Sequence, residues 1–152
     1  MRAVARVLAL GLLLSLLVSG CRGTGKAGEF TGEFQAMSLG DAPSILQRHF
    51  EQQKAVPGLT VYTQDGQTYL LLRAGRVEEP GMGIQVLAVK PPVKGSRLAQ
   101  VVAMLQPTPG ETGTYPYVLL VLQGGTDLSY RARLSTRSEV PLELPGIPLV
   151  EK

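Results

Sequence analysis

The stretch LTVYTQDGQTYLLL, residues 59–72, decides which class of fold the sequence predicts. Two runs rich in apolar, β-branched and aromatic residues, 59–63 and 68–72, flank Asp65-Gly66. Asp-Gly is a dipeptide that accepts the positive φ angles of a tight hairpin turn. We therefore expect two antiparallel strands joined at this turn.

Further strands are expected on both sides of this hairpin. A short strand fits residues 33–39, and apolar runs at 84–90, 98–105 and 117–122 have the near-continuous apolarity of central strands covered on both faces. Residues 130–135 instead alternate apolar and polar side chains, which predicts one buried and one solvated face. This spacing predicts a mainly β (α+β) fold, a small antiparallel β-sandwich or barrel-like sheet with one short packed helix.

The expected helix precedes the hairpin. Apolar residues recur at helical spacing within residues 45–50, Asp41 is placed to cap the first amides, and Pro57-Gly58 ends the helix. His49, the only histidine of the chain, falls on the apolar flank. The pattern favours a packed or boundary histidine over a ligand or base, because no metal ligand or carboxylate lies three or four residues away.

The N-terminus has the layout of an export signal. Residues 1–20 combine a short basic segment, an apolar run and small residues, which is typical of a secretory signal peptide. The apolar run, residues 7–18, is shorter than the ~20 residues of a membrane-spanning helix. An ordinary signal peptide would leave the single cysteine, Cys21, without a role.

The sequence Val18-Ser19-Gly20-Cys21 resembles the cleavage box of bacterial lipoproteins. This resemblance implies that Cys21 is acylated, with palmitate as the expected kind of chain, and becomes the N-terminus of the mature protein. It also implies an exported protein, anchored by lipid to the extracytoplasmic face of the bacterial cell membrane.

Cleavage after residue 20 would leave one domain-sized chain. The glycine-rich residues 21–32 are expected to form the lipidated N-terminus and a flexible tether, followed by a single β-rich domain at 33–152. Removal of Arg2 and Arg6 lowers the number of basic residues from 15 to 13, against 12 acidic ones. The remaining charge gives no argument for a nucleic-acid partner.

The sequence does not show the motifs of an enzyme. If Cys21 carries lipid, the chain has no other thiol for a disulfide, a nucleophile or a metal cluster. No G-x-S-x-G, S-x-x-K or phosphate-binding loop motif is present. We therefore expect no catalytic residue, no metal site and no cofactor.

The loop at residues 80–84 is a first candidate contact. Gly81 and Gly83 allow positive φ angles or close backbone approach, and Met82 between them would be an adaptable apolar tip. In the alternative, which the residue types favour, both glycines serve a bulge at a strand start and Met82 packs inward.

Tyr115-Pro116-Tyr117 is a second candidate contact. Pro116 cannot donate a ladder hydrogen bond, so it belongs at the start or edge of a strand, with the two tyrosines at the rim. They form an aromatic binding rim or, as is more common, cap a core with their hydroxyls in water.

The C-terminal third contributes a basic stripe and a proline-rich end. Arg131, Arg133 and Arg137 could meet anionic lipid headgroups or an acidic partner, although a solvated edge strand that resists aggregation is the favoured interpretation. Residues 141–152 are expected to be extended along the domain or to trail from it.

Residues 69–122 resemble the C-terminal domain of the protease complex subunit PrcB family, which are bacterial lipoproteins. The matching pieces, in order, are YLLL, AG, PGMG followed by IQV, PTPG and YPYVLLV. The family's glycine loop usually reads T-G-G-Y, whereas residues 81–84 read G-M-G-I here. The resemblance implies a non-catalytic subunit or binding module and supplies no catalytic residue.

These observations predict a membrane-anchored cell-envelope lipoprotein that binds rather than catalyses. By the resemblance, it is a subunit or scaffold of a surface or secreted protease complex, with the membrane and a protease or other envelope protein as partners. The alternative is a protease inhibitor or another envelope ligand-binding lipoprotein. A hydrolase is disfavoured by the missing nucleophile motif and the single histidine.

Overall fold

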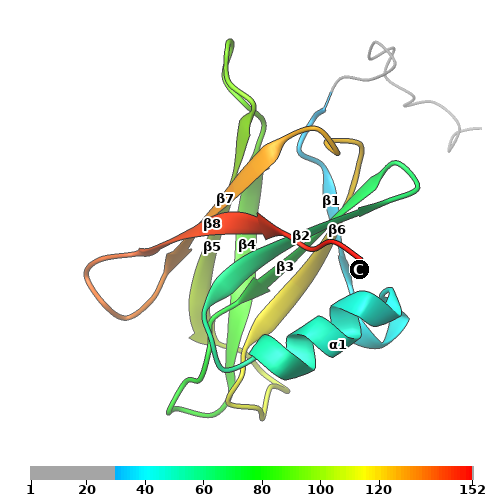
Figure 1. The fold of residues 1–152 in the computed structure, drawn as a ribbon. Helices are drawn as coiled ribbons and strands as arrows, with labels where there is room; N and C mark the ends of the chain where they lie inside the picture. The colour runs from blue at the N-terminus through cyan, green and yellow to red at the C-terminus, as the bar shows by residue number, and fades with distance from the viewer. Residues whose placement is uncertain (1–29, 152) are drawn as a thin grey trace, which may run out of the picture.

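Eight strands form one nearly closed, barrel-like sheet in the computed structural model, which describes residues 30–151 (Figure 1). The strands are β1 (Phe34–Met37), β2 (Gly58–Gln64), β3 (Gln67–Arg73), β4 (Met82–Lys90), β5 (Leu98–Pro107), β6 (Tyr117–Gln123), β7 (Ser129–Ser135) and β8 (Leu142–Pro148). The helices are the short 3-10 helix η1 (Leu39–Asp41) and α1 (Ser44–Gln53). The mainly β fold with one short helix is thus confirmed, while the predicted signal peptide and Cys21 lie outside the described residues.

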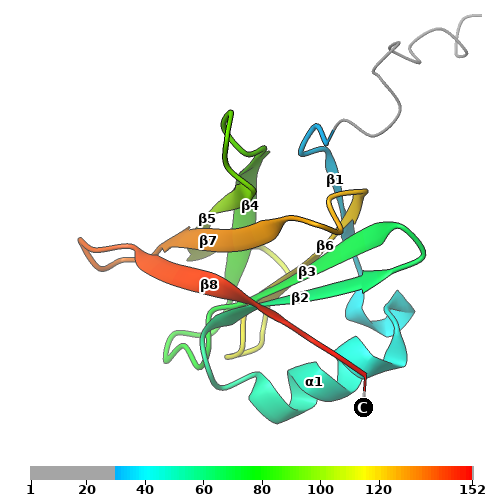
Figure 2. The same cartoon turned by 45° about the horizontal axis from the view of Figure 1, so that its top comes forward.

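The strand order is β1-β6-β3-β2-β8-β7-β5-β4. Two of the pairings, β2 with β8 and β5 with β7, are parallel, so the barrel-like sheet is mixed rather than antiparallel throughout. The proline-rich end is a full member of the sheet, because β8 pairs with β2 on one side and with β7 on the other. Figure 2 shows β8 crossing between these two strands and joining the halves of the barrel.

The hairpin at residues 59–72 is as the sequence predicts. Strands β2 and β3 pair along their full length, and the turn residues Asp65 and Gly66 have φ angles of 52° and 75°. Both angles lie in the left-handed region that a two-residue hairpin turn of this kind requires.

Two hydrophobic clusters lie on opposite faces of the same strands. The side chains of Leu70 and Leu72 belong to the cluster inside the barrel, whereas Tyr69 and Leu71 belong to the cluster that α1 covers from outside. Strand β3 is therefore buried on both faces, as its unbroken apolar run indicates. Strand β4 departs from that expectation, because it is an edge strand, and Leu87 at its bulge is exposed.

Helix α1 begins without the cap that the sequence predicted. Its N-cap is Pro43 and makes no side-chain hydrogen bond, while Asp41 ends the preceding η1. The Gln47 side chain instead reaches back, and its Nε2 donates to the Ala42 carbonyl at 2.8 Å. The apolar face predicted for the helix is confirmed, because Leu46 and Phe50 are its buried residues.

The arginine stripe does not belong to an edge strand. Strand β7 lies between β8 and β5, so the interpretation of Arg131, Arg133 and Arg137 as edge-strand charges is wrong. Alternation correctly predicted the solvent face of Arg131 and Arg133, whereas Arg137 lies beyond the end of β7. The same alternation occurs in an edge strand and in an interior strand with one solvated face. Arg133 pairs with Glu143 at 3.6 Å, and Arg137 pairs with Glu79.

The barrel has two ends of different construction (Figure 1). At the hairpin end, residues 30–33 lead into β1 beside the β4–β5 hairpin of residues 91–97. At the opposite loop end, residues 74–81 join β3 to β4 and residues 108–116 join β5 to β6. No helix within residues 30–151 is long and apolar enough to span a membrane.

Candidate functional site

The two candidate contacts of the sequence meet at the loop end. A cavity of about 300 Å³ is lined by five of the six residues singled out there, namely Met82, Gly83, Tyr115, Pro116 and Tyr117. The other lining residues are Met37, Glu111, Gly113, Val118 and Leu119. Gly81, the sixth, precedes the cavity wall and lies against the Glu111 carbonyl.

Backbone hydrogen bonds fix the two loops to each other. The Thr108 amide donates to the Gly81 carbonyl at 2.9 Å, and the Val77 amide donates to the Thr114 carbonyl at 2.8 Å. Gly81 has a φ angle of 83°, and a Cβ added at Gly83 would lie 2.5 Å from the Thr108 hydroxyl oxygen. Glycine is therefore favoured at position 81 by the backbone conformation and at position 83 by the close approach of the Thr108 side chain.

Met82 is not an exposed tip. Only 3% of its surface is accessible, and it occupies the first position of β4 with its side chain against the cavity. Met82 therefore packs inward, as the alternative interpretation of this loop predicts. The loop at 80–84 thus supplies the wall of the cavity rather than a protruding contact.

Tyr115 and Tyr117 are partly exposed, and each ring contacts a side chain in or just after α1. Tyr117 is 37% exposed, and its ring centroid lies 4.6 Å from that of Phe50. The Nζ atom of Lys54 lies 5.4 Å from the centroid of the Tyr115 ring, within the range of a cation–π contact. Pro116 is buried immediately before β6, where a missing amide donor disturbs no ladder. The result is an aromatic rim of fixed geometry.

A buried arginine, Arg73 on β3, lies in register with Tyr117 and binds the end of α1. The Nη1 atom of Arg73 donates to the carbonyls of Gln53, at 2.7 Å, and Val56, at 3.0 Å, where α1 ends. Its positive charge also suits the negative end of the helix dipole. Burial lowers the pKa of Arg73, and its Nε atom has no partner among the described residues. Nothing in the sequence indicates this contact, because the two segments meet only in the fold.

His49 and Arg73 both contact the hydroxyl group of Thr60. The Nε2 atom of His49 is 2.9 Å from the Thr60 hydroxyl oxygen, and burial, followed by the charge of Arg73, lowers the pKa of its ring. Thr60 is fully covered, so this pair cannot present a hydroxyl nucleophile to a substrate. This arrangement agrees with a packed boundary histidine.

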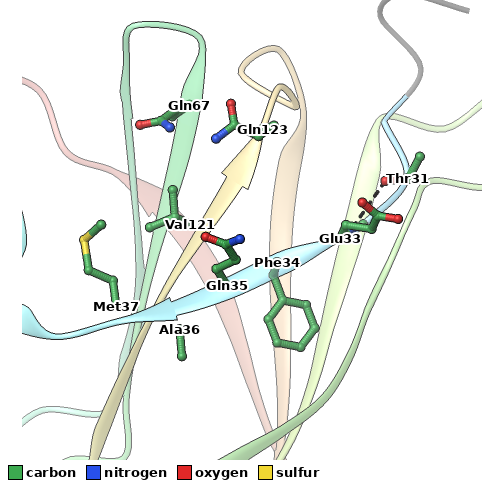
Figure 3. Close-up of a pocket in the computed structure, with 10 residues that line it drawn as sticks. Thr31, Glu33, Phe34, Gln35, Ala36, Met37, Gln67, Val121 and Gln123 are labelled. Carbon is green, nitrogen blue, oxygen red and sulfur yellow. Dashed lines mark hydrogen bonds between the residues drawn. The ribbon is translucent and has the colours of Figure 1, made fainter. Parts of the chain in front are cut away.

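A larger cavity lies elsewhere, on the outer face of β1, β6 and β3 (Figure 3). It measures about 670 Å³, and the side chains of Gln35, Gln67 and Gln123 gather on one side of β1, opposite Phe34. Its one charged lining residue, Glu33, leaves amide groups as the main hydrogen-bonding groups. This cavity could not be predicted from the sequence, because glutamines at outward strand positions look like ordinary solvated residues until the strands are placed side by side.

The described residues hold no cluster of three or more side chains suited to bind a metal ion. The chain matches no family model, no curated protein and no solved structure.

Proposed function

We propose that this chain is a lipid-anchored cell-envelope protein that acts as a non-catalytic binding module, and that its loop end binds a protein partner. The observation that carries the proposal is the convergence of two loops, distant in sequence, on one cavity beside the accessible rings of Tyr115 and Tyr117.

The dimensions of the cavity favour a protein partner over a small molecule. A volume of about 300 Å³ is at the lower limit of small-molecule pockets and fits one or two inserted side chains. Tyrosines bordering such a recess are typical of interface centres, where aromatic rings supply contact area at a low entropy cost. Glu111, exposed at the rim, adds a negative charge that would select a basic or neutral surface on the partner.

The resemblance of residues 69–122 to the protease complex subunit family suggests the class of partner. Both loops lie inside this segment, so the proposed partner is a secreted or surface protease that the domain helps to assemble or restrain. Acylation of Cys21 would confine the domain to the membrane and raise the effective concentration of any partner on the same surface.

Capture from native membranes tests the proposal. The full acylated chain should recover a protease or its maturation factor, identified by mass spectrometry. The charge reversal Glu111→Lys should reduce recovery at least fivefold, because one rim charge at an interface changes association through complementarity. Glu139→Lys, an equally exposed reversal in the β7–β8 loop, is the matched control.

Equal recovery with Glu111→Lys and Glu139→Lys would overturn the assignment of the loop end. A second assay separates assembly from inhibition, in which the protein is added to the purified partner protease. A higher yield of mature protease indicates an assembly subunit, and lower turnover indicates an inhibitor.

A further inference from the structure

The chain joins the barrel at the hairpin end. Gly32 is buried against the Val89 carbonyl and Pro91, and the ring of Phe30 lies 6.3 Å from that of Tyr130. Residues 30–32 are therefore held beside the β4–β5 hairpin. Cys21 precedes Phe30 by nine residues, which can span at most ~30 Å. A lipid on Cys21 would keep this end of the barrel near the membrane surface.

The hairpin carries an exposed apolar residue at its tip. Val93 is 76% exposed, and the turn is closed by a hydrogen bond of 2.9 Å from the Ser96 amide to the Val93 carbonyl. Leu98, at the start of β5, is also exposed. An isolated exposed valine is ordinary, but here it projects from the end to which the N-terminal segment is attached.

Basic side chains surround this tip. Residues 90–97 read KPPVKGSR, with three basic residues and no acidic one. Lys90 and Arg131 share one row of the outer sheet face, because both are in register with Gln100. At this end of the barrel, Lys90, Lys94, Arg97 and Arg131 are exposed and make no ion pair within residues 30–151; Arg48 and Arg76, which are also exposed and unpaired there, lie elsewhere. The acidic side chains that the structure describes at this end are Glu33, just before β1, and Asp65 and Asp127, on two other turns.

We propose that the hairpin end is a docking surface for an anionic lipid membrane, with Val93 at the interface and Lys94 and Arg97 on the headgroups. This inference rests on the proposed lipid anchor at Cys21. Basic residues near an anionic surface each strengthen binding about fivefold, and an apolar tip adds contact with the interfacial region. Docking at this end would hold the loop end away from the bilayer, where a protein partner can reach it (Figure 1).

A thiol-specific fluorophore tests the orientation. Cys21 is the only cysteine, so in the acylated full chain a Val93→Cys variant carries one free thiol. The variant is placed in vesicles of phosphatidylcholine and phosphatidylglycerol that contain nitroxide-labelled lipid. We expect the label at residue 93 to be quenched at least threefold more than a label at Val140→Cys. Val140 is the matched control, because it is 72% exposed and lies in the β7–β8 loop.

Charge reversal tests the role of the basic residues. Lys94→Glu with Arg97→Glu should lower the quenching at residue 93 to the level of the control position, and vesicles of phosphatidylcholine alone should do the same. The double variant Arg48→Glu with Arg76→Glu removes the same charge from exposed positions elsewhere and should leave the quenching unchanged.

The mass of the purified protein separates the two possible failures. Two results with an acylated chain would overturn the docking surface alone. One is equal quenching of the labels at 93 and 140, and the other is equal quenching at 93 in vesicles with and without anionic lipid. A chain recovered from membranes with an unmodified Cys21 would overturn the anchor and, with it, this inference.

Discussion

The two ends of the barrel differ in what their loops pack against and what they present to solvent. At the loop end, hydrogen bonds join residues 74–81 to 108–116, and the buried Arg73 ties β3 to the end of α1. At the hairpin end, a Cβ added at Gly95 would meet nothing within 4 Å, and Val93 lies in solvent. One end therefore has the fixed geometry that recognition of a protein surface needs, and the other presents charges suited to a fluid array of headgroups.

The largest expected effect concerns the support of the loop end. Replacing Arg73 by alanine removes the donors to two carbonyls at the end of α1 and leaves a cavity beside them. The free energy of unfolding should fall by about 3 kcal/mol in denaturant titrations. The exposed control Arg76→Ala should stay within about 0.5 kcal/mol of the unchanged protein. A loss below about 1 kcal/mol for Arg73→Ala would show that the loop end does not depend on this contact.

A smaller effect concerns closure of the barrel at the hairpin end. Gly32 and Gly95 have similar φ angles, 79° and 85°, so alanine at either position carries a similar backbone strain of about 1 kcal/mol. Only at Gly32 does the added Cβ collide with the Val89 backbone. Thermal and denaturant unfolding should therefore show Gly32→Ala to be destabilised by at least about 1 kcal/mol more than Gly95→Ala. Equal losses would mean that residues 30–32 are not fixed against β4.

Much of the fold could be predicted from local pattern. Asp65-Gly66 specified the hairpin, the alternation at 130–135 specified the buried face of β7, and the spacing of Leu46 and Phe50 specified the covered face of α1. Each of these signals is contained within a few neighbouring residues, so the chain alone is enough to interpret it.

The pairings between distant segments could not be predicted in this way. Strand β8 pairs in parallel with β2, and its prolines at 145 and 148 favoured an extended tail instead. Arg73 gives no sign in the sequence that it will meet the carbonyls of Gln53 and Val56. The loops at 80–84 and 114–117 were each noticed, but only the fold brings them to one cavity.

The smallest expected effect is a pH dependence at the boundary of α1. The pKa of His49 lies below its ordinary value of 6.5, because burial and the charge of Arg73 disfavour the protonated ring. The unfolded chain therefore binds more protons below that value, and stability falls as the pH drops through this window toward the folded pKa.

Denaturant titrations at a series of pH values measure this contribution. The stability of the unchanged protein relative to His49→Gln should decrease from neutral pH to about pH 5, where the unfolded histidine is charged. Both proteins contain the same carboxylates, so the contribution of these groups cancels in the difference between the two free energies of unfolding. A difference that rises as the pH is lowered would contradict the assigned direction.

Photocrosslinking from both ends in native membranes tests the central claim most directly. A photoreactive phenylalanine analogue is introduced at position 117 in one acylated chain and at position 93 in another, and the adducts are identified by mass spectrometry. The account predicts protein adducts containing a protease from position 117 and lipid adducts from position 93. Lipid adducts from position 117, with the protease crosslinked from position 93, would contradict it.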